Sequence, residues 1–286
     1  ISPMAFADLT TDLIAYYNFD ETSGTTGEDS SGNNYDLDTM TTGSFNDQFS
    51  WDTGKINNGL KIISTTEKRF IYASTLTHAN FPNDDFSVNL WVKVNKQTMT
   101  TRVPLMSWST NYDKFIFRFN KPDGSAADYR GTVSSYGHYI DSSMAYDVIS
   151  NDIDNLTDGN WKMVTLTRKK SSTNTDVKLY VNGSEVSSYN TQTNLNYALH
   201  DRSGGFGVGG ATLNTQEIVN GTMFDEVGIW SRALSSTEVS ELYNSGDGLQ
   251  YPFLSDINTP TASVSTGTYN NDFNVILSSD ENTTIY

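Results

Sequence analysis

Apolar and polar residues alternate with a period of two along several short stretches of the chain. The clearest stretch spans residues 86–94, and its apolar positions are Phe86, Val88, Leu90, Val92 and Val94. This period is typical of a β-strand with one buried side and one side facing water. We therefore expect a strand here whose five apolar side chains point into a core.

A second alternating stretch leads into a turn. Val177, Leu179 and Val181 repeat the strand pattern, and Asn182-Gly183 follows at once. Asn and Gly are the residues that best adopt the positive φ angles of a two-residue hairpin turn. The sequence predicts a tight hairpin at this point.

The stretch 223–230 combines strand alternation with a carboxylate pair. Met223, Asp225, Val227 and Ile229 fall on one side of the predicted strand, so Asp225 shares the side that should be buried and needs a partner there. The adjacent Glu226 should point to the opposite face.

A short helix is predicted directly after this strand. Ser235 and Glu238 have the spacing of a capping box, in which each side chain bonds the backbone N–H of the other residue. Val239, Leu242 and Tyr243 form one apolar stripe at helical spacing, and Gly246 is the expected C-terminal stop. We expect a two-turn helix.

Together these segments resemble a known family. LIAYYNFDETSGTTGEDSSGN at 13–33 and FDEVGIWSRALSSTEVSELYNSG at 224–246, with strand-like segments 86–94, 158–168 and 177–186 between them, are similar to laminin-G-like, concanavalin A-like lectin and glucanase domains. The resemblance implies an all-β fold: a two-sheet antiparallel jelly-roll sandwich with one short C-terminal helix, over residues 9–252. Such folds carry lectins, adhesive modules and some enzymes, so the fold does not fix the function.

Composition narrows the range of partners. The 286 residues include 34 Asp plus Glu but 18 Lys plus Arg, which gives a formal net charge of -16. This charge repels nucleic acid and anionic membrane surfaces. No stretch approaches the roughly 20 apolar residues of a spanning helix, so membrane insertion is not expected. Cysteine is absent, and the three His have no zinc-ligand spacing.

Both ends of the chain fall outside the predicted sandwich. Residues 1–8 are either a leader, since Ala5-Phe6-Ala7 is similar to a signal-peptide end, or a cloning remnant before a native start at Met4. Residues 253–260 are a predicted linker. Residues 261–286 resemble the start of the small β-sandwich modules appended to chitobiase-like proteins, which implies further domains of the same polypeptide.

Oxygen-bearing side chains in two segments predict a structural calcium ion. Asp29, Ser31 and Asn33 lie in one turn, and Asp225 lies on the closing strand; Asp20, Glu21 and Glu226 are second-rank ligands. Calcium takes six to eight oxygens, so a loop plus a strand carboxylate can bind it. The resemblance adds that family members often hold calcium at matching positions. The alternative is that the turn is an Asx-type turn and that Asp225 bonds backbone amides.

Catalysis is not expected. A glycosidase needs two carboxylates across a sugar cleft, and the Glu-x-Asp-x-x-Glu strand motif of the laminarinase-type members is absent. Asp225 and Glu226 are adjacent and should face opposite ways. His78, His138 and His200 accompany no recognisable nucleophile motif.

Binding of a glycan or polysaccharide is the leading functional hypothesis. Aromatic rings stack on the apolar faces of sugars while polar groups bond hydroxyls. The less periodic region 106–147 offers this mixture, and the candidate residues are Trp108, Tyr112, Arg130, Tyr136, His138 and Tyr139. Trp51, Trp91, Trp161 and Trp230 lie in or beside strand motifs and are assigned to packing.

The competing hypothesis is a structural or adhesive module of a cell-surface protein or of a virion. The acidic charge, the missing Cys and the incomplete second module fit it equally well. The expected location is accordingly extracellular or at the cell surface, or alternatively in a virion. The sequence does not separate the two functions.

Overall fold

The computed structural model describes residues 8–40, 45–63, 71–77, 80–81, 84–95, 103–109, 115–120, 132–138, 144–150, 156–170, 175–192, 205–209, 220–253, 261–262 and 277–278. The elements in chain order are β1 (Leu13–Tyr17), β2 (Thr39–Met40), η1 (Phe45–Asp47), β3 (Phe49–Thr53), β4 (Asn58–Ile62), β5 (Ile71–Ala73), β6 (Phe86–Asn95), β7 (Val103–Ser109), β8 (Phe115–Asn120), β9 (Thr132–His138), β10 (Met144–Ser150), β11 (Asp158–Lys170), β12 (Thr175–Val181), β13 (Ser184–Glu185), β14 (Ser187–Gln192), β15 (Gly205–Val208), β16 (Met223–Trp230), α1 (Ser236–Tyr243), η3 (Asn244–Gly246), β17 (Thr261–Ala262) and β18 (Leu277–Ser278).

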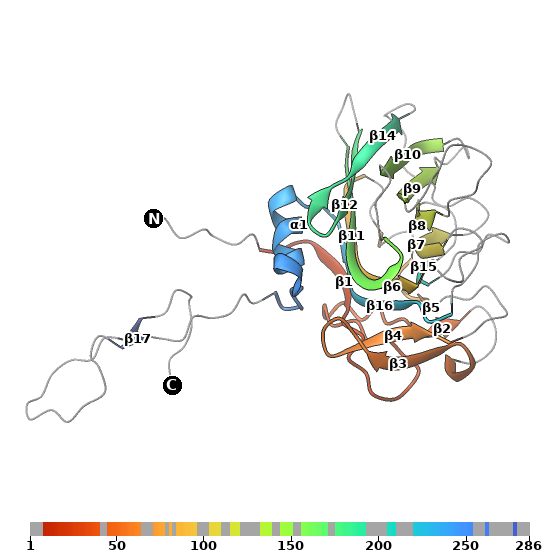
Figure 1. Ribbon diagram of the computed structural model, residues 1–286, viewed down its shortest axis with the longest axis vertical. Helices are drawn as coiled ribbons and strands as arrows, with labels where there is room; N and C mark the ends of the chain where they lie inside the picture. Colours follow the sequence, from red (N-terminus) through yellow and green to blue (C-terminus); the bar gives the residue numbers. More distant parts are fainter. Residues whose placement is uncertain are drawn as a thin grey trace, which may run out of the picture.

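Two antiparallel sheets form a sandwich (Figure 1). The first sheet has the order β13-β12-β11-β6-β16-β4-β3, with β1 also paired to β16. The second has the order β14-β10-β9-β8-β7-β15-β5-β2. Strands that are distant in sequence are neighbours in both sheets, as in a jelly roll. The expected fold class is confirmed.

The core lies between the two sheets, and β6 shows how the sequence builds it. The five apolar residues predicted to point inward, Phe86, Val88, Leu90, Val92 and Val94, are all at most 1% exposed. They pack into one cluster with apolar residues of both sheets. The predicted strand and its inward face are therefore confirmed.

The other face of β6 is buried as well, contrary to the sequence prediction. Asn89, on the side expected to face water, is 2% exposed, and Trp91 on the same side is also 2% exposed, as its assignment to packing predicts. A second apolar cluster lies on this outer face, and Val239 and Leu242 of α1 contribute to it. Figure 1 shows α1 beside the first sheet, away from the second. The helix thus covers the outer face of the first sheet, which would otherwise be exposed to solvent, and forms a second small core with it.

The predicted capping of α1 is confirmed at its start and differs at its end. The Ser235 side chain accepts a bond from Glu238 N at 3.2 Å, and Glu238 Oε2 accepts one from Ser235 N at 2.7 Å. The C-cap is Asn244, in the left-handed conformation with φ 47°, rather than Gly246. Asn tolerates this conformation, so it ends the helix two residues before the predicted glycine.

The hairpin predicted at 182–183 is present between β12 and β13. Asn182 and Gly183 have φ angles of 50° and 77°, as its turn requires. Farther along, β17 and β18 pair as two-residue strands. Most of the predicted linker and second module lies outside the described residues.

The two ends of the sandwich meet at Trp230, the last residue of β16. The indole Nε1 of Trp230 donates to the carbonyl of Leu9 at 2.7 Å. The ring of Phe253 lies 6.1 Å from the ring of Trp230, measured between centroids. The segments before β1 and after η3 are therefore side by side.

Candidate functional site

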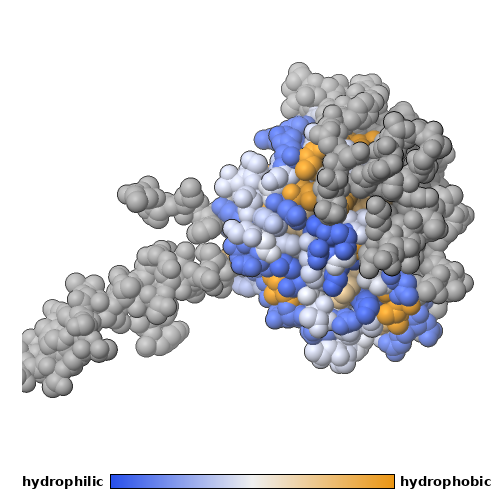
Figure 2. All heavy atoms as spheres, viewed as in Figure 1, coloured by the Kyte–Doolittle hydropathy of each residue, from blue (hydrophilic) through white to orange (hydrophobic). Residues whose placement is uncertain are grey.

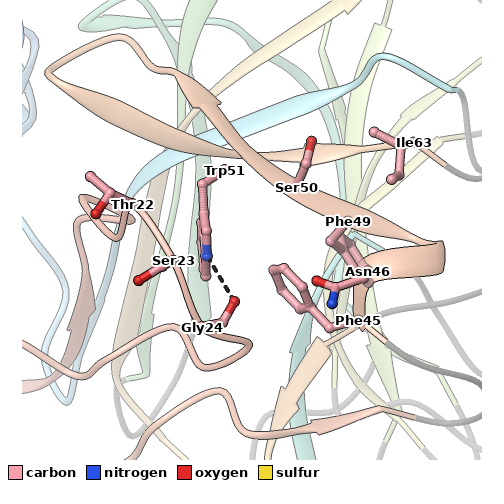
Figure 3. Close-up of a pocket in the computed structure, with 9 residues that line it drawn as sticks. All are labelled: Thr22, Ser23, Gly24, Phe45, Asn46, Phe49, Ser50, Trp51 and Ile63. Carbon is pink, nitrogen blue, oxygen red and sulfur yellow. Dashed lines mark hydrogen bonds between the residues drawn. The ribbon is translucent and has the colours of Figure 1, made fainter.

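An open hollow lies beside the edge strand β3. Its volume is about 290 Å³, and its lining residues are Thr22, Ser23, Gly24, Phe45, Asn46, Phe49, Ser50, Trp51 and Ile63. They come from the loop after β1, from η1, from β3 and from the end of β4 (Figure 3). On the face seen in Figure 2, small apolar areas lie among polar ones over β3 and β4. Ile63 is 37% exposed and adds apolar surface at the rim.

The indole of Trp51 is half-buried and fixed in place. Its Nε1 donates to the carbonyl of Gly24 at 3.1 Å. Its ring centroid lies 5.1 Å from that of Phe45, which Figure 3 shows pointing towards it, and 6.2 Å from that of Phe19. The hydrogen bond and the two rings hold the indole, so it presents a preorganised aromatic surface to the hollow.

The loop that carries Thr22, Ser23 and Gly24 is attached firmly to its surroundings. Asp20 Oδ1 accepts a bond from Asn58 N at 3.2 Å, and Asp20 Oδ2 accepts one from Gln250 Nε2 at 2.7 Å. Glu21 Oε1 accepts a bond from Glu28 N at 2.7 Å. One wall of the hollow is therefore anchored to β4 and to the segment after η3.

A buried carboxyl pair lies behind this wall, on β16. Asp225 is 0% exposed and Glu226 is 1% exposed. The strict alternation predicted for the pair is wrong, because the register of β16 shifts between Asp225 and Gly228 and Glu226 has a φ of 51°. This bulge puts both side chains inside the protein instead of on opposite faces.

Each carboxyl group of the pair has its own partners. Asp225 Oδ2 accepts bonds from Lys55 N at 2.7 Å and Ile56 N at 2.9 Å, and Oδ1 accepts one from Glu226 N at 2.9 Å. Glu226 Oε2 accepts a bond from the Tyr16 hydroxyl, and Oε1 accepts none within the described part of the chain.

Burial controls the protonation of both groups. It raises the pKa of Asp225 to about 8, although the three amides act in the opposite direction. Burial, together with the neighbouring Asp225, raises the pKa of Glu226 to about 9. Both groups are therefore largely protonated at neutral pH. A protonated carboxyl pair sealed from water is a structural element of the interior.

The first-rank residues predicted to bind calcium are occupied by other contacts. Asp29 accepts bonds from Tyr16 N at 2.9 Å, Ser31 N at 3.0 Å and Tyr35 N at 3.0 Å. Asn33 Nδ2 donates to the carbonyl of Ile14 at 2.9 Å. These bonds attach the turn to one edge of β1, whereas β16 pairs with the other.

The predicted ligand set is therefore not gathered around one point. Asp225 binds the amides of the turn between β3 and β4, and no contact joins it to Asp29 among the described residues. Within those residues, no group of three or more His, Cys, Asp or Glu could hold a metal ion. Of the second-rank ligands, Asp20 is close enough to raise the pKa of both Asp225 and Glu226.

Of the six residues predicted to bind glycan, only Trp108 has a side chain within the described part of the chain. Trp108 is 2% exposed and packs in the core, with its ring centroid 4.9 Å from that of Phe81. It offers no face to a sugar, and its prediction as a stacking platform is corrected. Tyr136 and His138 lie on β9, but their side chains are outside the described part. Tyr112, Arg130 and Tyr139 also lie outside the described residues.

The sequence assigns Trp51 to packing because it lies in a strand-like stretch, and the residue does pack against the core between the sheets. The sequence analysis does not predict that Trp51 also borders a hollow. Trp51 borders the hollow because β3 lies at the edge of its sheet, where it pairs with β4 and has no described strand on its other side. The loop after β1 lies beside this free edge. The Gly/Thr-rich loop at 22–27 was a usable signal, since such loops approach other backbone segments closely.

The two antiparallel sheets and their crossovers define the class of protein: a jelly-roll β-sandwich. A family model described as the concanavalin A-like lectin/glucanases superfamily, Laminin_G_3, matches residues 71–240. The chain belongs to this family.

Solved structures support the same fold. The binding domain of Paraclostridial Mosquitocidal Protein 1 superposes with a TM-score of 0.57 at 16% identity, covering 83% of this chain and 53% of that one. The botulinum neurotoxin type G receptor binding domain gives 0.55 at 15%, covering 82% and 51%. The serotype D ligand binding domain in complex with N-acetylneuraminic acid gives 0.56 at 15%, covering 83% and 52%.

This chain spans about half the length of those structures. None of the curated proteins matches it. Among the described residues, no helix is long and apolar enough to cross a membrane.

Proposed function

We propose that the chain is a non-catalytic, carbohydrate-binding module of a larger extracellular or surface protein. The observation that carries this proposal is the hollow at Trp51. Its indole is held by the Gly24 carbonyl and faces an open space that the hydroxyl-bearing residues Thr22, Ser23 and Ser50 help to line. A sugar needs this combination, because its ring has an apolar face for stacking and hydroxyls for hydrogen bonds.

The buried carboxyl pair supports the non-catalytic part of the proposal. A glycosidase places its two carboxyl groups on either side of a bound sugar, at separations of roughly 5 to 9.5 Å. Asp225 and Glu226 are instead adjacent on one strand, enclosed, and largely protonated at neutral pH. They hold a backbone turn and the Tyr16 hydroxyl.

The test is a broad glycan array, followed by calorimetry on the best ligand. Trp51→Ala should weaken binding roughly five- to thirtyfold, since one stacked ring contributes on the order of 1–2 kcal/mol. Because Trp51 also packs on Phe45, Asn46→Ala and Ser50→Ala probe the same hollow from its polar rim. Trp161→Ala is the matched control, as Trp161 is half-buried on the outer cluster.

Two results would overturn the proposal. If no glycan binds on the array with calcium present, the structural or adhesive function replaces it. If glycan binds but Trp51→Ala, Asn46→Ala and Ser50→Ala leave the affinity unchanged, the hollow is not the site.

A further inference from the structure

All nine residues that line the Trp51 hollow are uncharged. The lining offers aromatic and aliphatic carbon from Phe45, Phe49, Trp51 and Ile63, together with hydroxyl and amide groups. A carboxylated ligand in such a site would give up water without gaining an ionic partner from the lining. Placing a charge against uncharged groups is unfavourable unless strong hydrogen bonds compensate it.

Acidic residues flank three of the four segments that line the hollow. Glu21 precedes Thr22, and burial raises the pKa of Glu21. Asp47 follows Asn46 within η1 and is exposed. Asp52 follows Trp51 on β3, and its hydrogen bond with Lys61 keeps its pKa below the usual value.

Among the described residues, Lys61 is the positively charged residue that strand pairing places nearest to the lining, and Asp52 neutralises its charge. Lys61 on β4 lies directly opposite Ser50, a lining residue on β3. Its Nζ lies 2.6 Å from Asp52 Oδ2. The ammonium group therefore pairs with an acid of the same hairpin, and the field around the hollow follows the acidic excess of the chain, with its net charge of -16.

The size of the hollow limits how much of a glycan it receives. Its volume of about 290 Å³ is at the low end of small-molecule pockets, which range over roughly 300–1,000 Å³. One sugar ring fits such a space, and the remaining units would extend past the open rim.

We infer that the Trp51 hollow takes the terminal ring of a neutral glycan, stacked by its apolar face, and disfavours carboxylated sugars. The inference rests on the proposed carbohydrate-binding function and adds the class of ligand. The inferred ligand differs from N-acetylneuraminic acid, the carboxylated sugar bound in one solved structure of the same fold.

The experiment compares two glycans with the same core, one ending in galactose and one ending in N-acetylneuraminic acid. Calorimetry should show roughly tenfold or more weaker binding of the acidic glycan at low salt, and the difference should shrink as salt screens the charges. Trp51→Ala should weaken binding of the neutral glycan.

A charge-matched pair of variants tests the electrostatic argument. Asp52→Asn removes the partner of Lys61 beside the hollow and should improve binding of the acidic glycan several-fold while leaving the neutral one unchanged. Asp158→Asn removes the partner of Lys162, 3.3 Å away on β11, and changes the net charge equally. It should improve neither.

The outcomes distinguish the inference from the function. If the acidic glycan binds as tightly as the neutral one and Trp51→Ala abolishes its binding, the class of ligand is wrong and the carbohydrate-binding function stands. If Asp52→Asn and Asp158→Asn act alike, the local charge argument fails. If neither these glycans nor any on the array binds, both proposals fail.

Discussion

The hydroxyl of Tyr16 on β1 donates a hydrogen bond to Oε2 of Glu226 on β16, inside the protein. The two residues are 210 positions apart in the chain, and the bond joins the opening strand to the closing strand. Both groups are shielded from water, and burial raises the pKa of Tyr16 well above its ordinary value. The pair of side chains carries either no charge or one negative charge. Their hydrogen bond acts as a clamp that joins β1 to β16.

Tyr16→Phe should destabilise the protein because it leaves a buried carboxyl without its donor. We expect the free energy of unfolding to fall by roughly 1–3 kcal/mol, as measured by urea denaturation. Tyr17→Phe is the matched control, since its hydroxyl bonds the neutral carbonyl of Tyr35 at 2.6 Å and should contribute less. A Tyr16→Phe protein as stable as wild type would contradict the clamp.

Stability should decrease as the pH rises towards 9 in the presence of chelator. The folded pKa values of Asp225 and Glu226 are about 8 and about 9, against ordinary values of 3.8 and 4.5. Between these limits the folded state holds protons that the unfolded state has released, so the free energy of unfolding falls with pH by up to ~1.4 kcal/mol per unit for each group. The fall should level off above pH 9.

Urea denaturation across this pH range, in wild type and in Glu226→Gln, measures the contribution of Glu226. The variant keeps the shape of the side chain without a titrating proton, so its slope should be shallower. An unchanged slope would mean that Glu226 titrates normally and that its burial does not govern its charge.

Gly54→Ala should destabilise the turn between β3 and β4. A Cβ at this position would lie 2.6 Å from Asp225 Oδ2, the oxygen that binds the amides of Lys55 and Ile56. We expect a loss of roughly 1–3 kcal/mol in thermal or urea unfolding, because neither backbone nor a buried carboxyl can move freely. Thr53→Ala, at an exposed position of the same hairpin, should change little, and equal losses in both variants would refute the steric argument.

Ser235→Ala should weaken α1 by removing one half of its capping box. The expected loss is roughly 0.5–2 kcal/mol in the free energy of unfolding. Ser236→Ala, one residue later and exposed, is the control and should be nearly neutral. If both variants behave alike, the side chain of Ser235 does not hold the helix start.

Local patterns predicted the elements that local chemistry determines. The inward face of β6, the hairpin at Asn182-Gly183 and the N-cap of α1 each depend on residues within one segment, and each is confirmed. The resemblance carried by the two end segments predicted the sandwich itself, and the family match confirms it.

Features that depend on long-range pairing could not be predicted. The bulge that turns Glu226 inward lies where one edge of β16 changes its partner from β4 at its start to β1 at its end, while β6 pairs with the other edge before and after the bulge. The sequence predicts a binding role for Trp108 and a packing role for Trp51, but β7 lies inside its sheet and β3 lies at an edge, so the Trp108 indole is enclosed and the Trp51 indole borders a hollow. Strand order decides this, and alternation does not encode it.

The meeting of Leu9 and Phe253 at Trp230 has a mechanical consequence. The segments that precede and follow the sandwich leave it at the same place. Any domains joined to these two segments would therefore attach at one end of the sandwich instead of at opposite ends. Tension along such a chain loads the contacts around Trp230 first and bypasses the strand pairs of both sheets. The hollow at Trp51 would keep its shape while the flanking segments are pulled, and a bound ligand would keep its contacts.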